Sequence, residues 1–303
     1  MSRIQDILSK AERDGTTRRT RSLSDSASAA AVATPREPAP VVTGRAAPVT
    51  AFEPSPAPWN AGAAAPVLEP PAPSPVAPSF DGQLVAAIAP QSTAAERYRL
   101  LRTRIKQAER GRTLRSIIIT SPSKGDGKSL TAANLALTMA QEFHQRVLLL
   151  DADLRRPAVA RMFGLPDGPG LTEVLMGVAD TESALVHLED QHLTVMPAGS
   201  PVAQPAELLG SASMRRVLDT LSKTYDRILI DMPPVAPLAD VHVLSPSVDG
   251  LLMIVRAGST PKPAIERALA GLDISKVLGL VLNGTGDPIP DGYEYGGYGY
   301  IGG

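Results

Sequence analysis

The sequence predicts an α/β fold with a doubly wound, mostly parallel sheet, because apolar runs alternate with helical patterns along much of the chain. These runs lack a polar residue at every second position, which is typical of parallel strands that helices cover on both faces. Aspartates end two of the runs, at the sheet edge where such folds bind their ligands. We therefore expect one sizeable domain with its site at the carboxyl ends of the strands.

Six short apolar runs are the expected strands, and the expected helices precede and separate them. The strands span 116–120, 147–151, 193–197, 227–231, 251–255 and 277–283. The helices span 92–110, 130–142, 157–163, 171–176, 206–222 and 263–272. The first helix begins at Ser92 or Thr93, since both residue types are preferred N-caps.

Composition divides the chain into a short amphipathic helix, a disordered linker, a folded domain and a flexible tail. These parts span residues 1–15, 16–80, 81–287 and 288–303, respectively. The linker is rich in proline and alanine, so it cannot bury enough surface to offset the entropy lost on ordering. The amphipathic helix over residues 1–15 either docks on a partner or has no role, because a helix this short is marginally stable alone.

Charge and residue content exclude several functions. The formal net charge is −1, so no basic excess points to nucleic acid. Cysteine is absent, which excludes disulfides and thiolate metal sites. No apolar stretch reaches the roughly 18 residues needed to span a bilayer. We expect a cytoplasmic protein that would contact a membrane through a partner.

The segment SPSKGDGKS follows an expected strand and opens an expected helix, which is the context of a phosphate-binding loop. Its glycines let the backbone aim N–H groups at an anion. Lys128 can reach the β- and γ-phosphates, and the Ser129 hydroxyl can ligate Mg²⁺. The expected nucleotide-binding residues of the loop are Ser123, Lys124, Gly125, Asp126, Gly127, Lys128, Ser129 and Leu130.

Two positions of this loop depart from known patterns. Pro122 stands where the spacing GxxxxGK[ST] has its first glycine, so an incidental GKS in a glycine-rich turn is the alternative interpretation. Plasmid-partition and division-site ATPases carry a second lysine five residues before the loop lysine, where this chain has Ser123. Lys124 is therefore either a general cation on the phosphate side or a solvated charge.

Aspartates end the two runs VLLLDADLRRP and RILIDMPP. Asp151 and Asp153, spaced by two, point the same way while the chain stays extended. They could hold Mg²⁺ through water or accept a hydroxyl proton, and an ordinary strand-end turn is the alternative. Asp231 resembles the aspartate of a Walker B segment, which binds Mg²⁺ through water. Arg155 could pair with a carboxylate or with phosphate.

In this order, the phosphate loop, DADLR and LIDMPP resemble the bacterial tyrosine kinase family, P-loop enzymes that regulate exopolysaccharide synthesis. The resemblance covers about residues 90–300 and includes LTEVLMG, MPAGSPVAQPAELL and GLVLNG. It implies a P-loop NTPase fold that uses ATP and Mg²⁺. It implies catalytic roles for Lys128, Asp151 and Asp153. It also implies a metal site at Ser129, Asp151 and Asp231. The linker resembles that of tyrosine autokinases found beside exosortase-type polysaccharide loci.

Three further features match the family. Glu96, Arg99 and Arg102 fit its ExxRxxR pattern, which packs against a neighbouring subunit in a ring; a solvated charged helix is the alternative. Asn283 ends the last expected strand, where related P-loop ATPases contact adenine. The tail holds the expected phosphorylation cluster, Tyr293, Tyr295, Tyr298 and Tyr300.

The resemblance implies an ATP-dependent protein-tyrosine autokinase that phosphorylates its own tail within a homo-oligomer. It also implies a separate membrane chain-length regulator, a phosphotyrosine phosphatase and recruitment to the inner face of the plasma membrane. The main alternative is a nucleotide-switch ATPase for positioning or assembly. The tyrosine cluster argues against that alternative, and the intact GKS and three aspartates argue against a scaffold with an inactive loop.

Overall fold

The computed structural model of the protein describes residues 80–285, except for 110, 143 and 144. The expected N-terminal helix, the linker up to residue 79 and the tyrosine-rich tail lie outside these described residues. Among the helices that are described, none is both long enough and apolar enough to cross a bilayer.

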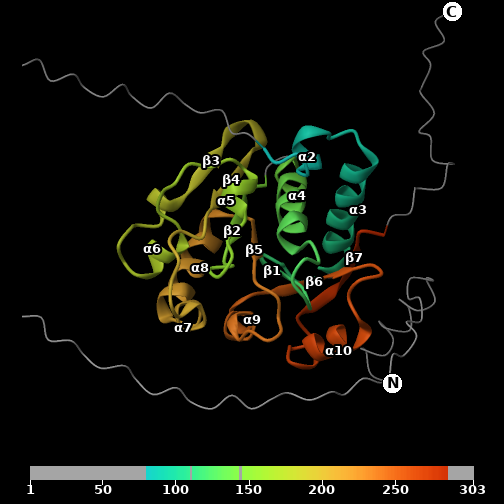
Figure 1. Cartoon of the computed structure of the whole chain (residues 1–303). Coiled ribbons are helices and arrows are strands. Elements are labelled where there is room, and N and C mark those ends of the chain that lie inside the picture. The colour runs from blue at the N-terminus through green and yellow to red at the C-terminus, as the bar shows by residue number, and fades with distance from the viewer. Residues whose placement is uncertain (1–79, 110, 143–144, 286–303) are drawn as a thin grey trace, which may run out of the picture. The chain divides into compact units, whose positions relative to one another are not determined.

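The domain is built on a seven-stranded sheet with the order β3-β4-β2-β5-β1-β6-β7 (Figure 1). All neighbouring strands are parallel except β3 and β4, so the predicted doubly wound, mostly parallel sheet is confirmed. The sequence did not predict β3, whose three residues are too few to show a pattern. The strands are β1 (Ser116–Thr120), β2 (Val147–Asp151), β3 (Val186–Leu188), β4 (Leu193–Met196), β5 (Arg227–Asp231), β6 (Gly250–Arg256) and β7 (Val277–Asn283).

The helices connect these strands and vary widely in length. The α-helices are α2 (Val85–Ile88), α3 (Thr93–Ala108), α4 (Lys128–Ala140), α5 (Val159–Met162), α6 (Leu171–Leu175), α7 (Pro205–Leu209), α8 (Ala212–Thr224), α9 (Asp240–Leu244) and α10 (Lys262–Ala270). Three single-turn 3₁₀ helices span Glu182–Ala184, Glu189–Gln191 and Ser245–Ser247.

The helix expected over 206–222 is two helices, so that prediction is wrong in this detail. Gly210 ends α7, and the Ser211 hydroxyl caps α8 by accepting a hydrogen bond from the Met214 N–H at 3.2 Å. A serine that satisfies a free N–H at a helix start is a strong initiation signal. The short helices α2 and α9 were also not predicted, because neither is long enough to show a helical period.

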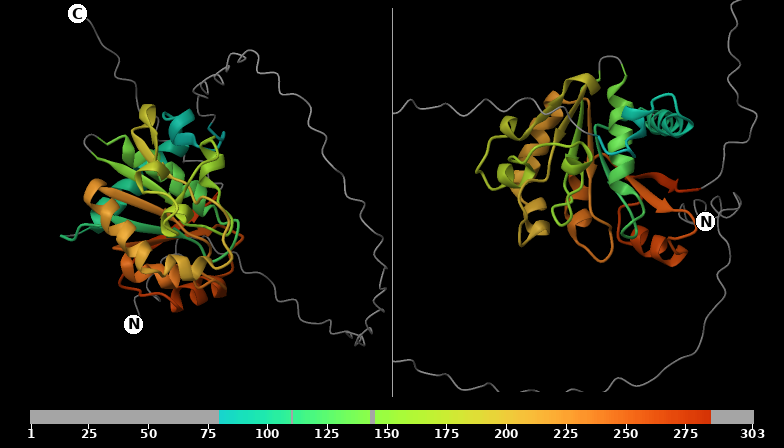
Figure 2. Two further views of the ribbon diagram at one scale, coloured as in Figure 1. Left: turned by 90° about the vertical axis from the view of Figure 1, so that its left-hand side faces the viewer. Right: turned by 45° about the horizontal axis from the view of Figure 1, so that its top comes forward.

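Helices cover both faces of the sheet and bury two apolar cores (Figure 2). Ile118 of β1 packs in the core beneath α6, α8, α9 and α10. Its neighbours Ile117 and Ile119 point to the opposite face, beneath α3, α4 and α5. Full burial of one such side chain contributes about 1.5–3 kcal/mol. Because both faces are buried, the strands are apolar throughout, as the sequence indicated.

Candidate functional site

The phosphate loop joins β1 to α4 and has the backbone that anion binding requires. Gly125 and Gly127 adopt φ of 89° and 92°, a region that favours glycine. Gly127 is the N-cap of α4, so the positive end of that helix faces the loop. Pro122 is buried and needs no left-handed backbone, which explains why the missing first glycine does not prevent the loop from forming.

Lys128 lies between two buried carboxylates at the mouth of the loop. Its ammonium is 2.7 Å from Asp153 Oδ2 and 3.5 Å from Asp231 Oδ1, and it donates a hydrogen bond to Ser129 Oγ at 3.0 Å. Burial lowers the pKa of Lys128, but the charges of Asp231 and Asp153 outweigh this effect and raise it. Lys128 therefore carries a positive charge where a phosphate would bind.

Asp231 has the properties of a metal-facing carboxylate. It is fully buried at the end of β5, and its Oδ2 has no hydrogen-bond partner among the described residues. Burial raises the pKa of Asp231 to about 6, although the charge of Lys128 lowers it. A buried carboxylate oxygen without a partner is costly unless a cation or donor binds it. The site therefore fits Mg²⁺, whose other expected protein ligands are Ser129 and Asp151.

Protein groups alone do not form a complete metal cage here. Within the described part of the chain, no group of three His, Cys, Asp or Glu side chains is arranged to hold an ion. Mg²⁺ usually keeps several waters and binds through one or two carboxylates together with phosphate oxygens. The residues present fit a metal that arrives with a nucleotide.

Asp151 lies directly beside Asp231 on the neighbouring strand, but its oxygens are already used. Oδ2 accepts N–H bonds from Ala158 and Val159, each at 3.0 Å, and Oδ1 accepts one from Asp153 at 3.1 Å. Burial and the charge of Asp231 raise the pKa of Asp151 to about 7, although the N–H donors lower it. Asp151 thus holds the loop that carries Asp153, a role that strand periodicity alone does not reveal.

Arg155 pairs with a residue that the sequence did not single out. Its Nε and Nη2 donate to the two carboxylate oxygens of Asp240 at 2.8 and 3.0 Å. Asp240 is fully buried at the start of α9, whereas Arg155 is partly exposed. The expected pairing of Arg155 with a site carboxylate or with phosphate is therefore replaced by this two-pronged ion pair, which fixes the guanidinium beside the site.

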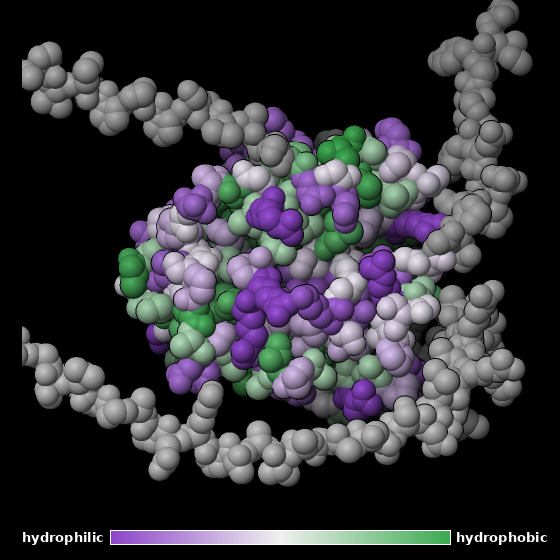
Figure 3. All heavy atoms as spheres, viewed as in Figure 1, coloured by the Kyte–Doolittle hydropathy of each residue, from purple (hydrophilic) through white to green (hydrophobic). Residues whose placement is uncertain are grey.

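Two further candidate residues differ in their surroundings: Asn283 bonds to the loop, whereas Lys124 is exposed. The Asn283 amide donates to the Asp126 carbonyl at 2.9 Å, which uses one of its two N–H groups, and its expected contact with adenine stays a prediction. Lys124 is exposed and makes no bond to the described residues, which supports the solvated-charge interpretation. In the viewed face of the molecule, hydrophilic residues gather in a band across the middle (Figure 3).

The charged face of α3 contacts its own chain. Arg99 pairs with Glu96 at 2.7 Å and also donates to the Pro90 carbonyl. Arg102 donates to the Thr138 carbonyl at 2.7 Å and lies 3.6 Å from Glu142, so it ties α3 to the end of α4. Arg99 and Arg102 are both only partly exposed, and the expected subunit contact of this face stays a prediction.

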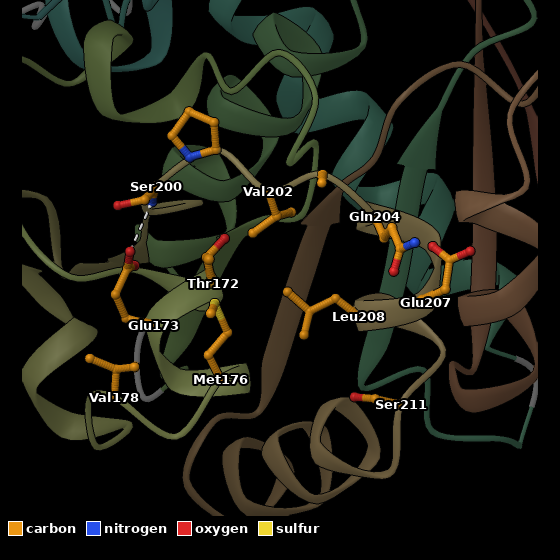
Figure 4. Close-up of a pocket in the computed structure, with 12 residues that line it drawn as sticks. Thr172, Glu173, Met176, Val178, Ser200, Val202, Gln204, Glu207, Leu208 and Ser211 are labelled. Carbon is orange, nitrogen blue, oxygen red and sulfur yellow. Dashed lines mark hydrogen bonds between the residues drawn. The ribbon is translucent and has the colours of Figure 1, made fainter. Parts of the chain in front are cut away.

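A pocket of about 740 Å³ lies between α6 and α7 (Figure 4). Met176, Val202 and Leu208 provide apolar walls, and Glu173 accepts a bond from the Ser200 N–H at 3.1 Å. Two of the lining residues, Met176 and Val178, are 61% and 74% exposed. None of the predicted site residues lines this pocket.

The fold and this loop define the class of protein: a P-loop NTPase. The sequence profile of a family described as "ParA: NUBPL iron-transfer P-loop NTPase" matches residues 113–281. The chain is 38% identical over 218 residues to "Tyrosine-protein kinase YwqD" of Bacillus subtilis, with 71% of this chain and 91% of YwqD covered. The chain belongs to the bacterial tyrosine kinase family.

Two further relatives agree with this assignment. The kinase domain of Escherichia coli tyrosine kinase ETK superposes with a TM-score of 0.62 at 29% identity, covering 66% of this chain and 79% of that domain. "Succinoglycan biosynthesis transport protein ExoP" of Rhizobium meliloti is 34% identical over 202 residues, which are 65% of this chain but 26% of ExoP. The predicted family is confirmed, and one of these relatives, ExoP, is named for succinoglycan biosynthesis.

Proposed function

We propose that this chain is an ATP-dependent protein-tyrosine autokinase that regulates exopolysaccharide synthesis or export. The observation that carries the proposal is the position of Lys128, 2.7 Å from Asp153 and beside the unpartnered Oδ2 of Asp231, at the mouth of a phosphate loop. The names of its relatives support tyrosine as the acceptor. The proposed acceptors are Tyr293, Tyr295, Tyr298 and Tyr300 of the tail.

The proposed reaction is an in-line transfer of the γ-phosphoryl group. The tyrosine oxygen forms a bond to the γ-phosphorus, the bond from that phosphorus to the β–γ bridging oxygen breaks, and ADP leaves. Lys128 and the loop N–H groups hold the phosphates and offset their developing charge. Mg²⁺, when bound at Ser129 and Asp231, would supply further positive charge to the phosphate oxygens.

Asp153 is the carboxylate best placed to receive the phenolic proton. The oxygens of Asp151 are occupied by three N–H donors, and Asp231 faces the proposed metal. Asp153 Oδ2 instead contacts Lys128 and would be released when that ammonium turns to the phosphates. A proton acceptor must lie within hydrogen-bond reach of the hydroxyl it serves.

The tail assignment predicts where phosphate appears. Changing Tyr293, Tyr295, Tyr298 and Tyr300 to Phe should remove most of the phosphotyrosine formed with Mg·ATP. The matched control is Tyr98→Phe, because Tyr98 lies on α3 of the folded domain and is only partly exposed. Phosphotyrosine blotting is the measurement. Equal signals from the quadruple variant and the wild type would remove the tail from the proposal.

Transfer between neighbouring chains is physically reasonable within a ring. The thirteen residues 288–300 can extend over at most about 45 Å, which permits contact with a neighbour's site. We further propose that the exposed Glu96–Arg99 pair on α3 contributes to the subunit contact, as the family pattern implies. Arg102 keeps its structural role at α4.

Changing Glu96 and Arg99 together to Ala should give smaller assemblies with little change in melting temperature, since exposed ion pairs contribute only about 0–1 kcal/mol to folding. Arg102→Ala should instead lower the melting temperature, because it removes two α3–α4 contacts. Light scattering and thermal unfolding separate these effects. An unchanged mass distribution in the double variant would favour a solvated helix face.

The proposed partners follow the family. A separate membrane chain-length regulator would bring the chain to the inner face of the plasma membrane. A phosphotyrosine phosphatase would remove phosphate from the tail tyrosines. The partial match to ExoP supports such a partner, because ExoP extends well beyond the matched region.

A further inference from the structure

The phosphate loop is held from behind by two segments that are distant in sequence. One is the turn between β6 and α10, which supplies Arg256 and Thr260, and the other is Asn283 at the end of β7. Both segments meet at Asp126, in the middle of the loop. These contacts concern the shape of the loop rather than its direct contacts with phosphate.

Asp126 is a carboxylate in a loop that should bind anions, which by itself would repel phosphate. It is buried, and its Oδ2 accepts the Ser123 N–H at 2.9 Å while Oδ1 accepts the Thr260 hydroxyl at 2.7 Å. Both oxygens are thus satisfied by groups of the protein. The carboxylate closes the loop on itself and on the turn that follows β6.

Thr260 connects this carboxylate to Arg256. Its Oγ1 accepts the Arg256 N–H at 3.0 Å and donates to Asp126, and Arg256 Nη1 donates to the Gly125 carbonyl at 3.1 Å. Thr260 therefore has both of its hydroxyl functions committed to the loop and its support.

Asn283, at the end of β7, holds the phosphate loop through a second set of contacts. Its amide donates to the Asp126 carbonyl at 2.9 Å, and its own carbonyl accepts the Ala257 N–H at 2.8 Å. A Cβ on Gly127 would collide with the Asn283 amide, so the side chain fills the space beside the left-handed glycine. The ends of β6 and β7 thus hold the loop from two directions.

We infer that Thr260, acting through Asp126 and together with Asn283, is a positioning residue that holds the phosphate loop ready before nucleotide binds. A loop that is already ordered loses less entropy when its ligand arrives, so it binds more tightly. The sequence did not single out Thr260. The inference concerns nucleotide affinity and holds whether or not tyrosine is the acceptor.

The test compares Thr260→Val, which keeps the shape and removes the hydroxyl, with Thr260→Ser, which keeps the hydroxyl. Binding of a fluorescent ADP analogue with Mg²⁺ to the full chain should weaken about tenfold in Thr260→Val and recover in Thr260→Ser. KM for ATP should rise by a similar factor, with kcat little changed. The control is Thr220→Val, whose exposed hydroxyl donates to the Arg216 carbonyl far from the loop.

Wild-type affinity in Thr260→Val would overturn the inference, as would equal weakening in Thr260→Ser. Circular dichroism checks that each variant is folded. Because ADP binding needs no phosphoryl transfer, a chain that binds ADP normally but never phosphorylates tyrosine would contradict the proposed function while leaving this inference testable.

Discussion

Lys128→Met should lower tyrosine phosphorylation by at least about a hundredfold, because it removes the cation that faces the transferred phosphate. In the structure this ammonium is held by Asp153 and Asp231, so it is already within the site. Initial rates of phosphotyrosine formation at saturating Mg·ATP are the measurement. Lys223→Met is the matched control, since Lys223 is exposed in the last turn of α8 and belongs to none of the predicted sites.

The same change should also affect stability, which must be measured alongside activity. Lys128 lowers the pKa of Asp231, so its removal leaves two buried carboxylates without their cation. We therefore expect a lower melting temperature in Lys128→Met, with a folded chain confirmed by circular dichroism. Phosphorylation at the wild-type rate in folded Lys128→Met would falsify the assigned role of the lysine.

Asp231→Asn should reduce phosphorylation by at least about a hundredfold and yet stabilise the nucleotide-free protein above neutral pH. The pKa values of Asp231 and Asp151 are raised from 3.8 to about 6 and about 7, mainly by burial. Between pH 4 and 7 the folded chain therefore binds more protons than the unfolded chain. Stability attributable to these groups falls as pH rises through that window and is constant above it.

The neutral amide that Asp231→Asn introduces avoids the cost of a buried negative charge. The free energy of unfolding should therefore rise by about 1–3 kcal/mol at pH 8, and part of its pH dependence should disappear. Asp151→Asn is the contrasting variant. Both carboxylate oxygens of Asp151 now accept backbone N–H bonds, and the N–H₂ of the new amide would replace one of these acceptors with a donor. Neutralisation relieves the burial cost here too, but the lost hydrogen bonds offset it, so Asp151→Asn should gain less stability at pH 8 than Asp231→Asn. The measurement is the free energy of unfolding in urea, without metal, at pH 5 and pH 8 for both variants and the wild type. A less stable Asp231→Asn at pH 8 would contradict the explanation.

The sequence predicted those elements whose pattern is local and continuous. Strands β1, β2, β5 and β7 have the expected bounds, because each is an apolar run within the sheet. The break at Gly210 was missed because the apolar period continues across it, while Ser211 starts a new helix. Local spacing therefore predicted the sheet more reliably than the interruptions between helices.

The candidate site could be predicted only as far as its motifs extend. Lys128, Asp153 and Asp231 do lie together, and the sequence indicated that the aspartates would face the ligand-binding edge of the sheet. Asp240 and Thr260 carry no motif, and their partners Arg155 and Asp126 lie 85 and 134 residues away in the sequence. Such pairs arise from the strand order, which a single sequence does not specify.

The most direct test of the proposed function is to map phosphate on the wild-type chain after incubation with Mg·ATP. Mass spectrometry of its peptides should find phosphate on Tyr293, Tyr295, Tyr298 or Tyr300, and none in folded Lys128→Met treated in the same way. Consumption of ATP without phosphate on any tyrosine, in the presence and absence of a membrane partner, would contradict the kinase assignment. That result would identify the chain as a nucleotide-switch ATPase.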